Sequence, residues 1–239
     1  MKFSTATDQI NFKEGALLLI DKPLDWTSFD VVNKVRYALR HRYGIKKFKV
    51  GHAGTLDPKA TGLLLLCTGK YTKKLAELQG LPKTYTGTMK LGATTPTMDI
   101  EMAEDAQFST DHITPELIEA TRQQFLGEIE QIPPMFSAIK VEGVPLYKKA
   151  RKGQTVEVKP RKVTIHDFQI TRYEGNEVDF IVTSSKGTYI RSLAYDFGKA
   201  LKSGAYLTAL RRTKVHHYDV ADAWALEELI SYINDSSIQ

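Results

Sequence analysis

The sequence predicts an α+β protein with a mixed, mainly antiparallel central sheet flanked by helices. Apolar runs typical of strands are mixed with helical patterns, but no regular βαβ repeat is present. Residues 163–173 and 177–184 flank Glu174-Gly175-Asn176, a pattern typical of a hairpin between antiparallel strands. Because no linker divides the 239 residues, we expect a single domain over residues 1–239.

The first helix has the clearest pattern. The apolar run 16–20, which predicts a buried strand, stops at Asp21-Lys22-Pro23. Thr27 or Ser28 can then cap a helix over residues 29–42, in which Val31, Val35 and Ala38 recur at helical spacing. We therefore expect one face of this helix to be core and the opposite, basic face to be available to a ligand.

The remaining elements follow from apolar runs, cap residues and glycines. Strands are predicted at residues 63–68, 84–91 and 207–218, in addition to the hairpin. Further helices are predicted at residues 71–78, 114–127, 189–201 and 223–233. Residues 92–112 are predicted to form an exposed loop.

Composition excludes several classes of protein. Apolar residues make up 42% and charged residues 26%, as in an ordinary soluble globular protein. Cys67 is the only cysteine, so no intrachain disulfide can form, and no Cys/His spacing predicts a metal site. Without a signal peptide or a membrane-length apolar run, the chain is expected to be cytoplasmic and to contact no membrane. No phosphate-binding glycine loop is present, so no cofactor is predicted.

Basic residues are segregated along the chain, whose formal net charge is +5. No acidic residue lies between Asp30 and Asp57, and acidic residues gather from Asp99 to Glu119. Three basic runs stand out: Lys34, Arg36, Arg40, Arg42, Lys46, Lys47 and Lys49; Lys148, Lys149, Arg151, Lys152, Lys159, Arg161 and Lys162; and Arg211, Arg212 and Lys214. Such runs indicate either solvated surfaces or a face that binds a polyanion.

Asp57 stands in an unusual loop. Gly51 and Gly54 precede it, Pro58 follows it, and Gly62 leads into an apolar strand. Glycines permit tight turns and close backbone approach, whereas proline fixes φ, so the pattern indicates a rigid loop that presents one carboxylate. An Asx-turn, in which the aspartate bonds to its own backbone, is the plain alternative.

A resemblance decides between these interpretations. The run 51–62, Gly-His-Ala-Gly-Thr-Leu-Asp-Pro-Lys-Ala-Thr-Gly, resembles the catalytic motif of the bacterial-type tRNA pseudouridine-55 synthases, the TruB family. Five further blocks, in the family's order, are similar to its other motifs: Leu18-Leu19-Ile20-Asp21-Lys22-Pro23, Lys83-Thr84-Tyr85, residues 132–140, residues 185–193 and Leu210-Arg211-Arg212. The resemblance implies the pseudouridine synthase fold and isomerisation of a uridine in the T-loop of tRNA, at position 55.

The resemblance also implies roles for single residues. Asp57 would start the reaction, either by attacking C1′ or by assisting elimination at C2′ to give a glycal. Arg191 would pair with Asp57 and keep that carboxylate ionised and oriented. Tyr85 would stack on the target base and take a proton late in the reaction.

Four other residues are implied to bind the RNA. Tyr189 and Leu210 would line the uracil pocket, and Lys22 would lie near the site. His52 would stack where the flipped nucleotide has left the RNA. Residues 134–160, which carry the second basic run, would form an insertion that closes over the RNA.

The chain departs from the family pattern in two places. Pro96 stands where many members have an acidic residue, which leaves the role of that loop open, although Asp99 still matches. The further C-terminal RNA-binding domain of many members is expected to be absent.

Three functions stay open at this point. The first is a stand-alone synthase acting on the T-stem-loop of tRNA, as a monomer without a protein partner. The second is a guide-RNA-dependent synthase, whose family shares the Gly-His-x-Gly-Thr-Leu-Asp-Pro block. The third is an RNA-binding or tRNA-folding protein in which catalysis is secondary.

Overall fold

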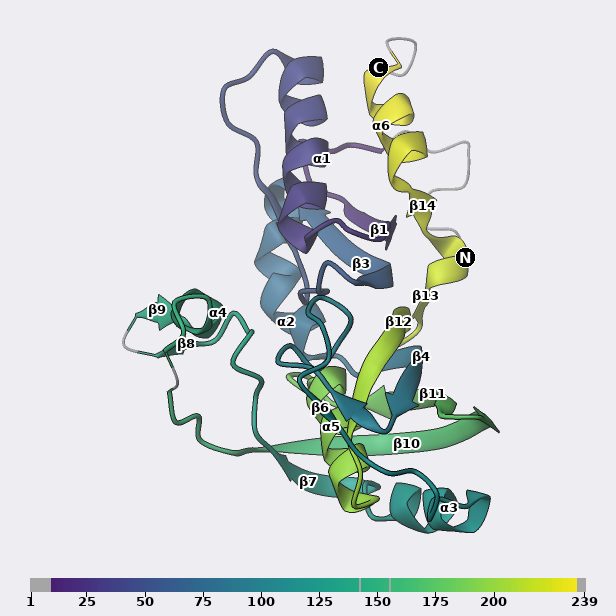
Figure 1. Ribbon diagram of the computed structural model, residues 1–239. Helices are drawn as coiled ribbons and strands as arrows, with labels where there is room; N and C mark the ends of the chain where they lie inside the picture. The colour runs from purple at the N-terminus through teal and green to yellow at the C-terminus, as the bar shows by residue number, and fades with distance from the viewer. Residues whose placement is uncertain (1–9, 142, 155, 236–239) are drawn as a thin grey trace. The chain divides into compact units, whose positions relative to one another are not determined.

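A computed structural model describes residues 10–141, 143–154 and 156–235 of the chain (Figure 1). The chain divides into two compact units. Unit 1 comprises residues 1–85 and 211–239, and unit 2 comprises residues 86–210. The strands β4 (Lys83–Leu91) and β12 (Ala205–Val215) have residues in both units.

Unit 1 is a sheet covered by helices. Its other elements are β1 (Leu17–Lys22), α1 (Ser28–Tyr43), β2 (Val50–His52), β3 (Ala60–Thr68), the 3-10 helix η1 (Gly69–Lys74), α2 (Leu75–Gly80), β13 (Tyr218–Asp219), the 3-10 helix η2 (Val220–Asp222), β14 (Trp224–Ala225) and α6 (Leu226–Asn234). The strand order runs β14-β1-β3-β12, and β1 and β2 both pair antiparallel with β3.

The strand β3 is apolar throughout because both of its faces are buried. Leu64 and Leu66 pack with α1 and α6, which lie side by side over one face of the sheet (Figure 1). Leu63 and Leu65 pack on the opposite face with Cys67, which is fully buried as expected. Burying a leucine side chain contributes about 1.5–3 kcal/mol, so this strand stabilises the unit from its centre.

The helix α1 confirms the prediction made from its cap residue and apolar spacing. Thr27 is the N-cap, and its side chain accepts a hydrogen bond from the backbone N–H of Asp30, whose carboxylate accepts one in return from the N–H of Thr27. The helix ends at Gly44, whose φ of 61° is the left-handed conformation that glycine adopts readily.

Unit 2 is built around a long hairpin. Its elements besides β4 and β12 are β5 (Ala93–Thr94), β6 (Ala106–Gln107), α3 (Pro115–Gln123), β7 (Gly127–Gln131), β8 (Lys140–Val141), β9 (Val144–Pro145), α4 (Leu146–Ala150), β10 (Arg161–Glu174), β11 (Glu177–Ser184) and α5 (Ile190–Ala200). The strand order β12-β4-β11-β10-β7 contains the predicted antiparallel hairpin as β10 and β11. The predicted α+β class with a mainly antiparallel sheet is therefore confirmed.

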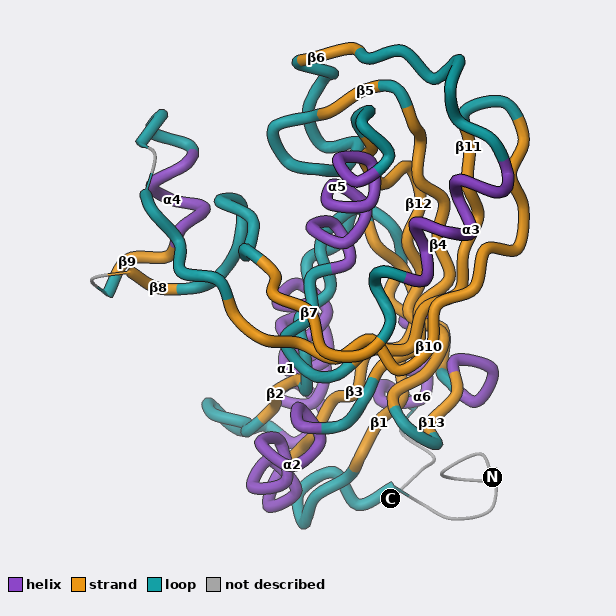
Figure 2. Tube along the Cα trace, turned by 90° about the horizontal axis from the view of Figure 1, so that it is seen from below, coloured by secondary structure: helices purple, strands orange, loops and turns teal. Residues whose placement is uncertain are grey.

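An aromatic cluster holds α5 against the hairpin of unit 2. The rings of Phe168 and Phe180 meet edge to face with centroids 5.9 Å apart, and Phe197 of α5 lies 5.8 Å from Phe168. By contrast, β8, β9 and α4 stand away from this sheet in both views (Figures 1 and 2). These elements, which lie within the predicted insertion 134–160, thus form a small projection of unit 2.

Two predicted elements need correction. The helix expected at residues 71–78 is divided into η1 and α2, because the chain first turns as a 3-10 helix after Gly69. Residues 92–112 were expected to be exposed, but Thr95, Thr97 and Asp99 are buried. Over the ranges that the structure describes, no helix is both long and apolar enough to cross a membrane.

Candidate active site

The Asp57 loop of unit 1 is held by its backbone. The Ser28 hydroxyl, at the start of α1, accepts a hydrogen bond from the Leu56 N–H at 2.8 Å and donates one to the Leu56 carbonyl at 3.1 Å. The Asp57 carbonyl accepts from the Ala60 N–H at 3.1 Å. Because the backbone on both sides of Asp57 is fixed, its half-buried side chain projects from a defined position.

Arg212 binds the backbone of the same loop through its guanidinium. It is 1% exposed and donates to the Gly54 carbonyl at 3.0 Å and to the Leu63 carbonyl at 2.7 Å. A Cβ at Gly62 would meet the Arg212 carbonyl oxygen at 2.3 Å, and the φ of Gly62 is +101°, so this position requires glycine. The backbone of Arg212 can therefore approach the end of the Asp57 motif only because residue 62 is glycine.

Lys22 supplies a positive charge beside Asp57. Its side chain is fully buried, and its ammonium donates to the carbonyls of Pro23 at 2.8 Å and Trp26 at 2.6 Å. A longer contact of 3.5 Å reaches the carbonyl of Pro58, the residue after Asp57. Burial lowers the pKa of Lys22 to about 8, while the nearby charge of Asp57 opposes that shift. Lys22 therefore ties down the loop and places a positive charge near Asp57.

The lowered pKa of Lys22 predicts a pH-dependent stability. A lysine with a folded pKa of about 8 and an ordinary value of 10.5 binds fewer protons when folded. Relative to Lys22→Met, the free energy of unfolding of the wild type should therefore rise by about 3 kcal/mol between pH 8 and pH 10.5. Urea titrations across that range should show the same relative rise in the exposed-lysine control Lys34→Met, because the raised pKa of Cys67, which opposes the rise, is common to all three proteins. Parallel pH curves for the wild type and Lys22→Met would contradict the assignment.

His52 and Tyr85 are the other predicted site residues of unit 1. His52 ends β2 and is half-buried, and its Nδ1 atom has no hydrogen-bond partner among the described residues. Burial lowers the pKa of His52, and the positive charge of Arg212 lowers it further. The imidazole is therefore neutral at pH 7, which suits stacking. Tyr85 lies on β4 and is 8% exposed.

Arg191 connects several segments of unit 2 through hydrogen bonds and an ion pair. It lies in the first turn of α5, is 4% exposed, and donates to the carbonyls of Thr97 and Phe136, each at 2.9 Å. Its Nε lies 3.7 Å from the buried Asp99 carboxylate. One guanidinium thus ties the loop of residues 95–99 and the start of the insertion to α5, which explains why that loop is buried.

Tyr189 is positioned by a glutamine. The Gln131 side chain, at the end of β7, accepts from the Tyr189 N–H at 2.8 Å and donates to the Tyr189 carbonyl at 3.0 Å. The half-buried Tyr189 ring faces the guanidinium of Arg161, whose central carbon is 6.0 Å from the ring centroid. Leu210, on β12, is also half-buried.

The predicted residues therefore fall into two groups. Unit 1 holds Asp57, Lys22, His52 and Tyr85, and the pKa of Lys22 responds directly to the charge of Asp57. Unit 2 holds Arg191, Tyr189 and Leu210. The pairing of Arg191 with Asp57 stays a prediction.

The third basic run, which the sequence left open as either a solvated surface or part of a polyanion-binding face, forms contacts within unit 1. Arg211 forms a two-bond ion pair with Asp21, at 3.0 and 2.6 Å, and Lys214 lies 3.4 Å from a carboxylate oxygen of Asp219. Arg212 is buried beneath the Asp57 loop. All three side chains therefore have partners within unit 1.

The prediction from sequence missed three positioning residues. Arg212 was placed in a basic run and in the family block Leu210-Arg211-Arg212 but was given no role, and Ser28 was predicted only as a possible helix cap. Gln131 carried no signal, because its role depends on pairing of β7 with β10 across an intervening insertion. In the described part of the chain, no three His, Cys, Asp or Glu side chains come together as a candidate metal site.

Comparison with known proteins identifies the family of the chain. The description "TruB family pseudouridylate synthase (N terminal domain)" matches residues 40–190, and "tRNA pseudouridylate synthase B C-terminal domain" matches residues 191–237. The tRNA pseudouridine synthase B of Flavobacterium johnsoniae is 62% identical over 213 residues, which cover 89% of this chain and 93% of that protein. The protein of the same name from Phocaeicola vulgatus is 50% identical over 230 residues, which cover 96% and 98%.

A solved structure extends the similarity to three dimensions. A crystal structure of a Cbf5-Nop10-Gar1 complex contains a chain that matches with a TM-score of 0.70 and 28% identity. The match covers 92% of this chain but only 55% of that one, so this chain spans about half the length of its structural neighbour. Since the family model covers more than half of the sequence and the relatives match over nearly all of it, this chain belongs to the TruB family of pseudouridylate synthases.

Proposed function

We propose that this chain is a tRNA pseudouridine synthase that isomerises the uridine at position 55, in the T-loop. The observation that carries the proposal is Asp57 in its backbone-held loop, beside the buried positive charge of Lys22, within a chain of the TruB family. The relatives named tRNA pseudouridine synthase B support tRNA as the substrate.

The chemistry needs no other reactant. Isomerisation breaks the N1–C1′ bond, turns the uracil within the site and forms the C5–C1′ bond. The proton on C5 is lost and N1 gains a proton, so atoms and electrons balance without a redox partner. Asp57 starts the reaction, either as the nucleophile at C1′ or by assisting proton loss at C2′.

The other predicted residues act around this carboxylate. We assign Arg191 to pairing with Asp57, because a buried guanidinium keeps a carboxylate ionised and oriented. Tyr85 stacks on the uracil and takes a proton late in the reaction, while Tyr189 and Leu210 line the base pocket. The neutral imidazole of His52 fills the space that the flipped nucleotide leaves in the RNA.

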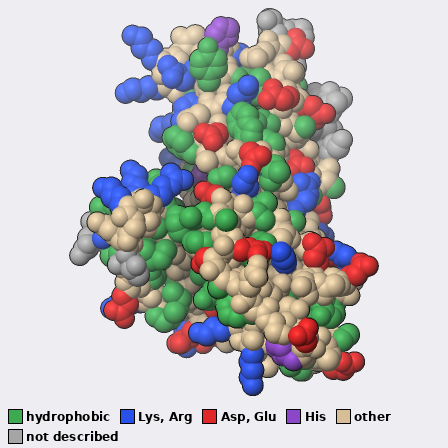
Figure 3. All heavy atoms as spheres, in the orientation of Figure 1, with side chains coloured by type: hydrophobic (Ala, Val, Ile, Leu, Met, Phe, Trp, Pro, Cys, Tyr) green, Lys and Arg blue, Asp and Glu red, His purple; other side chains and the backbone are tan. Residues whose placement is uncertain are grey.

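The insertion of residues 134–160 is proposed to clamp the RNA backbone. Lys148, Arg151 and Lys152 are exposed on or just after α4, where Figure 3 shows a group of basic side chains. Arg191 and the Phe136 carbonyl tie the start of this segment to α5. A phosphate clamp anchored in this way would be linked directly to a predicted catalytic residue.

We propose that the chain acts in the cytoplasm, as a monomer and within a single catalytic domain, without a guide RNA or protein partner. The structural neighbour in a Cbf5-Nop10-Gar1 complex is 28% identical to this chain, whereas the tRNA pseudouridine synthase B relative reaches 62%. The higher identity favours tRNA as a direct substrate. A protein that only folds tRNA would not need the ordered Asp57 loop.

The stand-alone function is tested by supplying RNA and nothing else. Purified protein should release tritium from C5-labelled uridine in an isolated T-stem-loop, because sequence and loop shape are read by the protein itself. A stem-loop with cytidine at the target position is the control and should release none. A strict requirement for an added RNA or protein would favour the guide-dependent alternative.

A further inference from the structure

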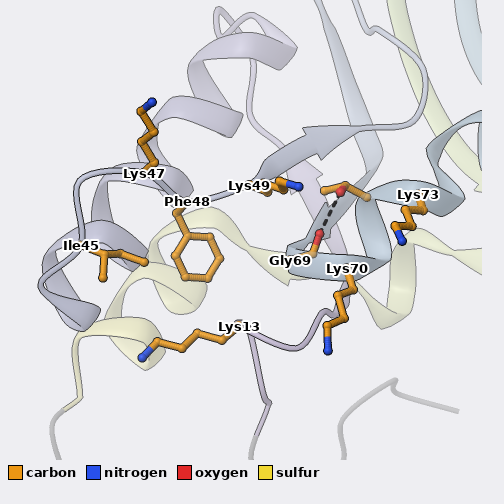
Figure 4. Close-up of a pocket in the computed structure, with 9 residues that line it drawn as sticks. Lys13, Ile45, Lys47, Phe48, Lys49, Gly69, Lys70 and Lys73 are labelled. Carbon is orange, nitrogen blue, oxygen red and sulfur yellow. Dashed lines mark hydrogen bonds between the residues drawn. The ribbon is translucent and has the colours of Figure 1, made fainter.

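Unit 1 contains a pocket of about 370 Å³ whose lining is dominated by lysines (Figure 4). The five lysines come from three separate stretches of the chain: Lys13, Lys47, Lys49, Lys70 and Lys73. The pocket therefore collects part of the first basic run together with lysines that the sequence did not connect to it.

The backbone around the pocket is locked. The Gly69 N–H donates to the Lys49 carbonyl at 3.0 Å, which joins η1 to the segment before β2. A Cβ at Gly69 would meet the Lys13 carbonyl oxygen at 2.3 Å, so all three stretches touch at this glycine. Phe48 forms part of the wall, is 8% exposed and stacks on Tyr43 with ring centroids 5.6 Å apart. The lysines are thus carried by a preformed concave surface.

The positive charge of the pocket is largely uncompensated. Its lining contains no carboxylate, and Glu14 at its edge pairs with Lys70 alone. The Lys13 ammonium lies over the Tyr43 ring, 4.4 Å from its centroid. Within the described ranges, Lys47, Lys49 and Lys73 have no ion pair with any acidic side chain. Like charges gathered in this way repel one another, and a bound polyanion would relieve that repulsion.

The pocket lies far from Asp57 along the same strand. The Asp57 loop leads into the start of β3 at Ala60, whereas Gly69 follows the end of β3 at Thr68. At about 3.3 Å per residue, the nine residues of β3 separate the two by roughly 25–30 Å. With at most about 3.4 Å of rise per base pair, this distance corresponds to roughly eight base pairs or more, which is longer than a T-stem.

We propose that this lysine pocket binds backbone phosphates of the substrate tRNA that lie beyond the T-stem-loop. The ammonium of lysine is a compact point charge that binds phosphate without a fixed geometry. The proposal rests on the proposed function and adds to it a second, remote contact with the same RNA. Its consequence is that the enzyme distinguishes whole tRNA from the isolated stem-loop by affinity.

The double variant Lys49→Gln/Lys73→Gln tests the pocket, with Lys199→Gln/Lys202→Gln as a control that removes two exposed lysines of unit 2. Affinity and initial rate are measured for full-length tRNA and for the isolated T-stem-loop. The pocket variant should bind full-length tRNA about five- to tenfold more weakly than the wild type. The slope of log association constant against log salt concentration should become less negative by about 1 to 2, because one or two phosphate contacts are lost. Its stem-loop affinity, its rate at saturating RNA and every value of the control should match the wild type.

Three other outcomes would overturn the proposal. Equal weakening for both RNAs would place the contact within the stem-loop, and unchanged affinity for both would remove RNA from the pocket altogether. Tripolyphosphate that binds the wild type but not the variant, with tRNA affinity unchanged, would assign the pocket to a free anion. The pocket is judged from the difference in RNA affinity between the variant and the wild type. Failure of the proposed function would appear differently, as a wild-type protein that forms no pseudouridine.

Discussion

Replacing Asp57 by asparagine is expected to abolish pseudouridine formation while leaving RNA affinity within about threefold of the wild type. The amide cannot attack C1′ or accept a proton at C2′, so the rate should fall by about 10⁴-fold or more. The fold should survive, because the loop is held through the backbone contacts of Ser28 and Arg212 rather than through the Asp57 side chain alone. Tritium release from C5-labelled uridine measures the rate, and filter binding measures the affinity.

Asp25→Asn is the matched control for this change. Asp25 is another loop aspartate of unit 1, exposed and paired with Lys59 at 2.7 Å. Its φ of 64° is a conformation that asparagine tolerates, and an exposed ion pair contributes no more than about 1 kcal/mol. Activity retained by Asp57→Asn, or lost equally in Asp25→Asn, would show that Asp57 does not start the reaction.

The second large effect concerns stability. Arg191→Gln should lower the free energy of unfolding by about 3–5 kcal/mol, because it leaves the buried Asp99 carboxylate without its cation. The carbonyls of Thr97 and Phe136 would lose their donors as well. In urea titrations, adding Asp99→Asn to Arg191→Gln should recover part of the loss, since the second change removes the buried charge.

Arg172→Gln provides the comparison for Arg191→Gln. Arg172 also pairs with carboxylates, those of Glu174, Glu177 and Asp179, but its side chain is 42% exposed. Exposed pairs contribute little because water screens them, so this variant should lose about 1 kcal/mol or less. Equal losses for the two variants, or no recovery in the double variant, would contradict the structural role of Arg191.

Elements specified by neighbouring residues could be predicted from the sequence. The helix α1 follows from its Thr27 cap, its apolar spacing and Gly44, and the hairpin of β10 and β11 follows from the turn at Gly175. The apolar run of β3 predicted a buried strand, and burial on both faces explains why it shows no alternation.

Features made by distant residues could not be predicted in the same way. The buried guanidinium of Arg212 donates to the carbonyls of Gly54 and Leu63, which lie about 150 positions earlier in the chain. Thr97 and Asp99 are buried because Arg191, more than 90 positions later, binds that loop. Arginine is usually exposed, so the sequence predicts a surface position for both side chains, and only their tertiary contacts explain why they are buried.

The candidate site also depended on more than local chemistry. The sequence pattern around Asp57 was compatible with an ordinary Asx-turn, and the family motifs gave the carboxylate its catalytic interpretation. The structure adds the physical support for that interpretation, in the form of a buried lysine beside Asp57 and a buried arginine beneath its loop.

The central claim is that Asp57 of this chain forms pseudouridine at position 55 of tRNA. Its most direct test is the mapping of pseudouridine in total tRNA from cells that lack this protein, complemented with the wild type or with Asp57→Asn. We predict that uridine replaces pseudouridine at position 55 in the deletion strain and in the Asp57→Asn strain, and that the wild type restores the modification. Pseudouridine persisting at position 55 in the deletion strain, or restored by Asp57→Asn, would contradict the claim.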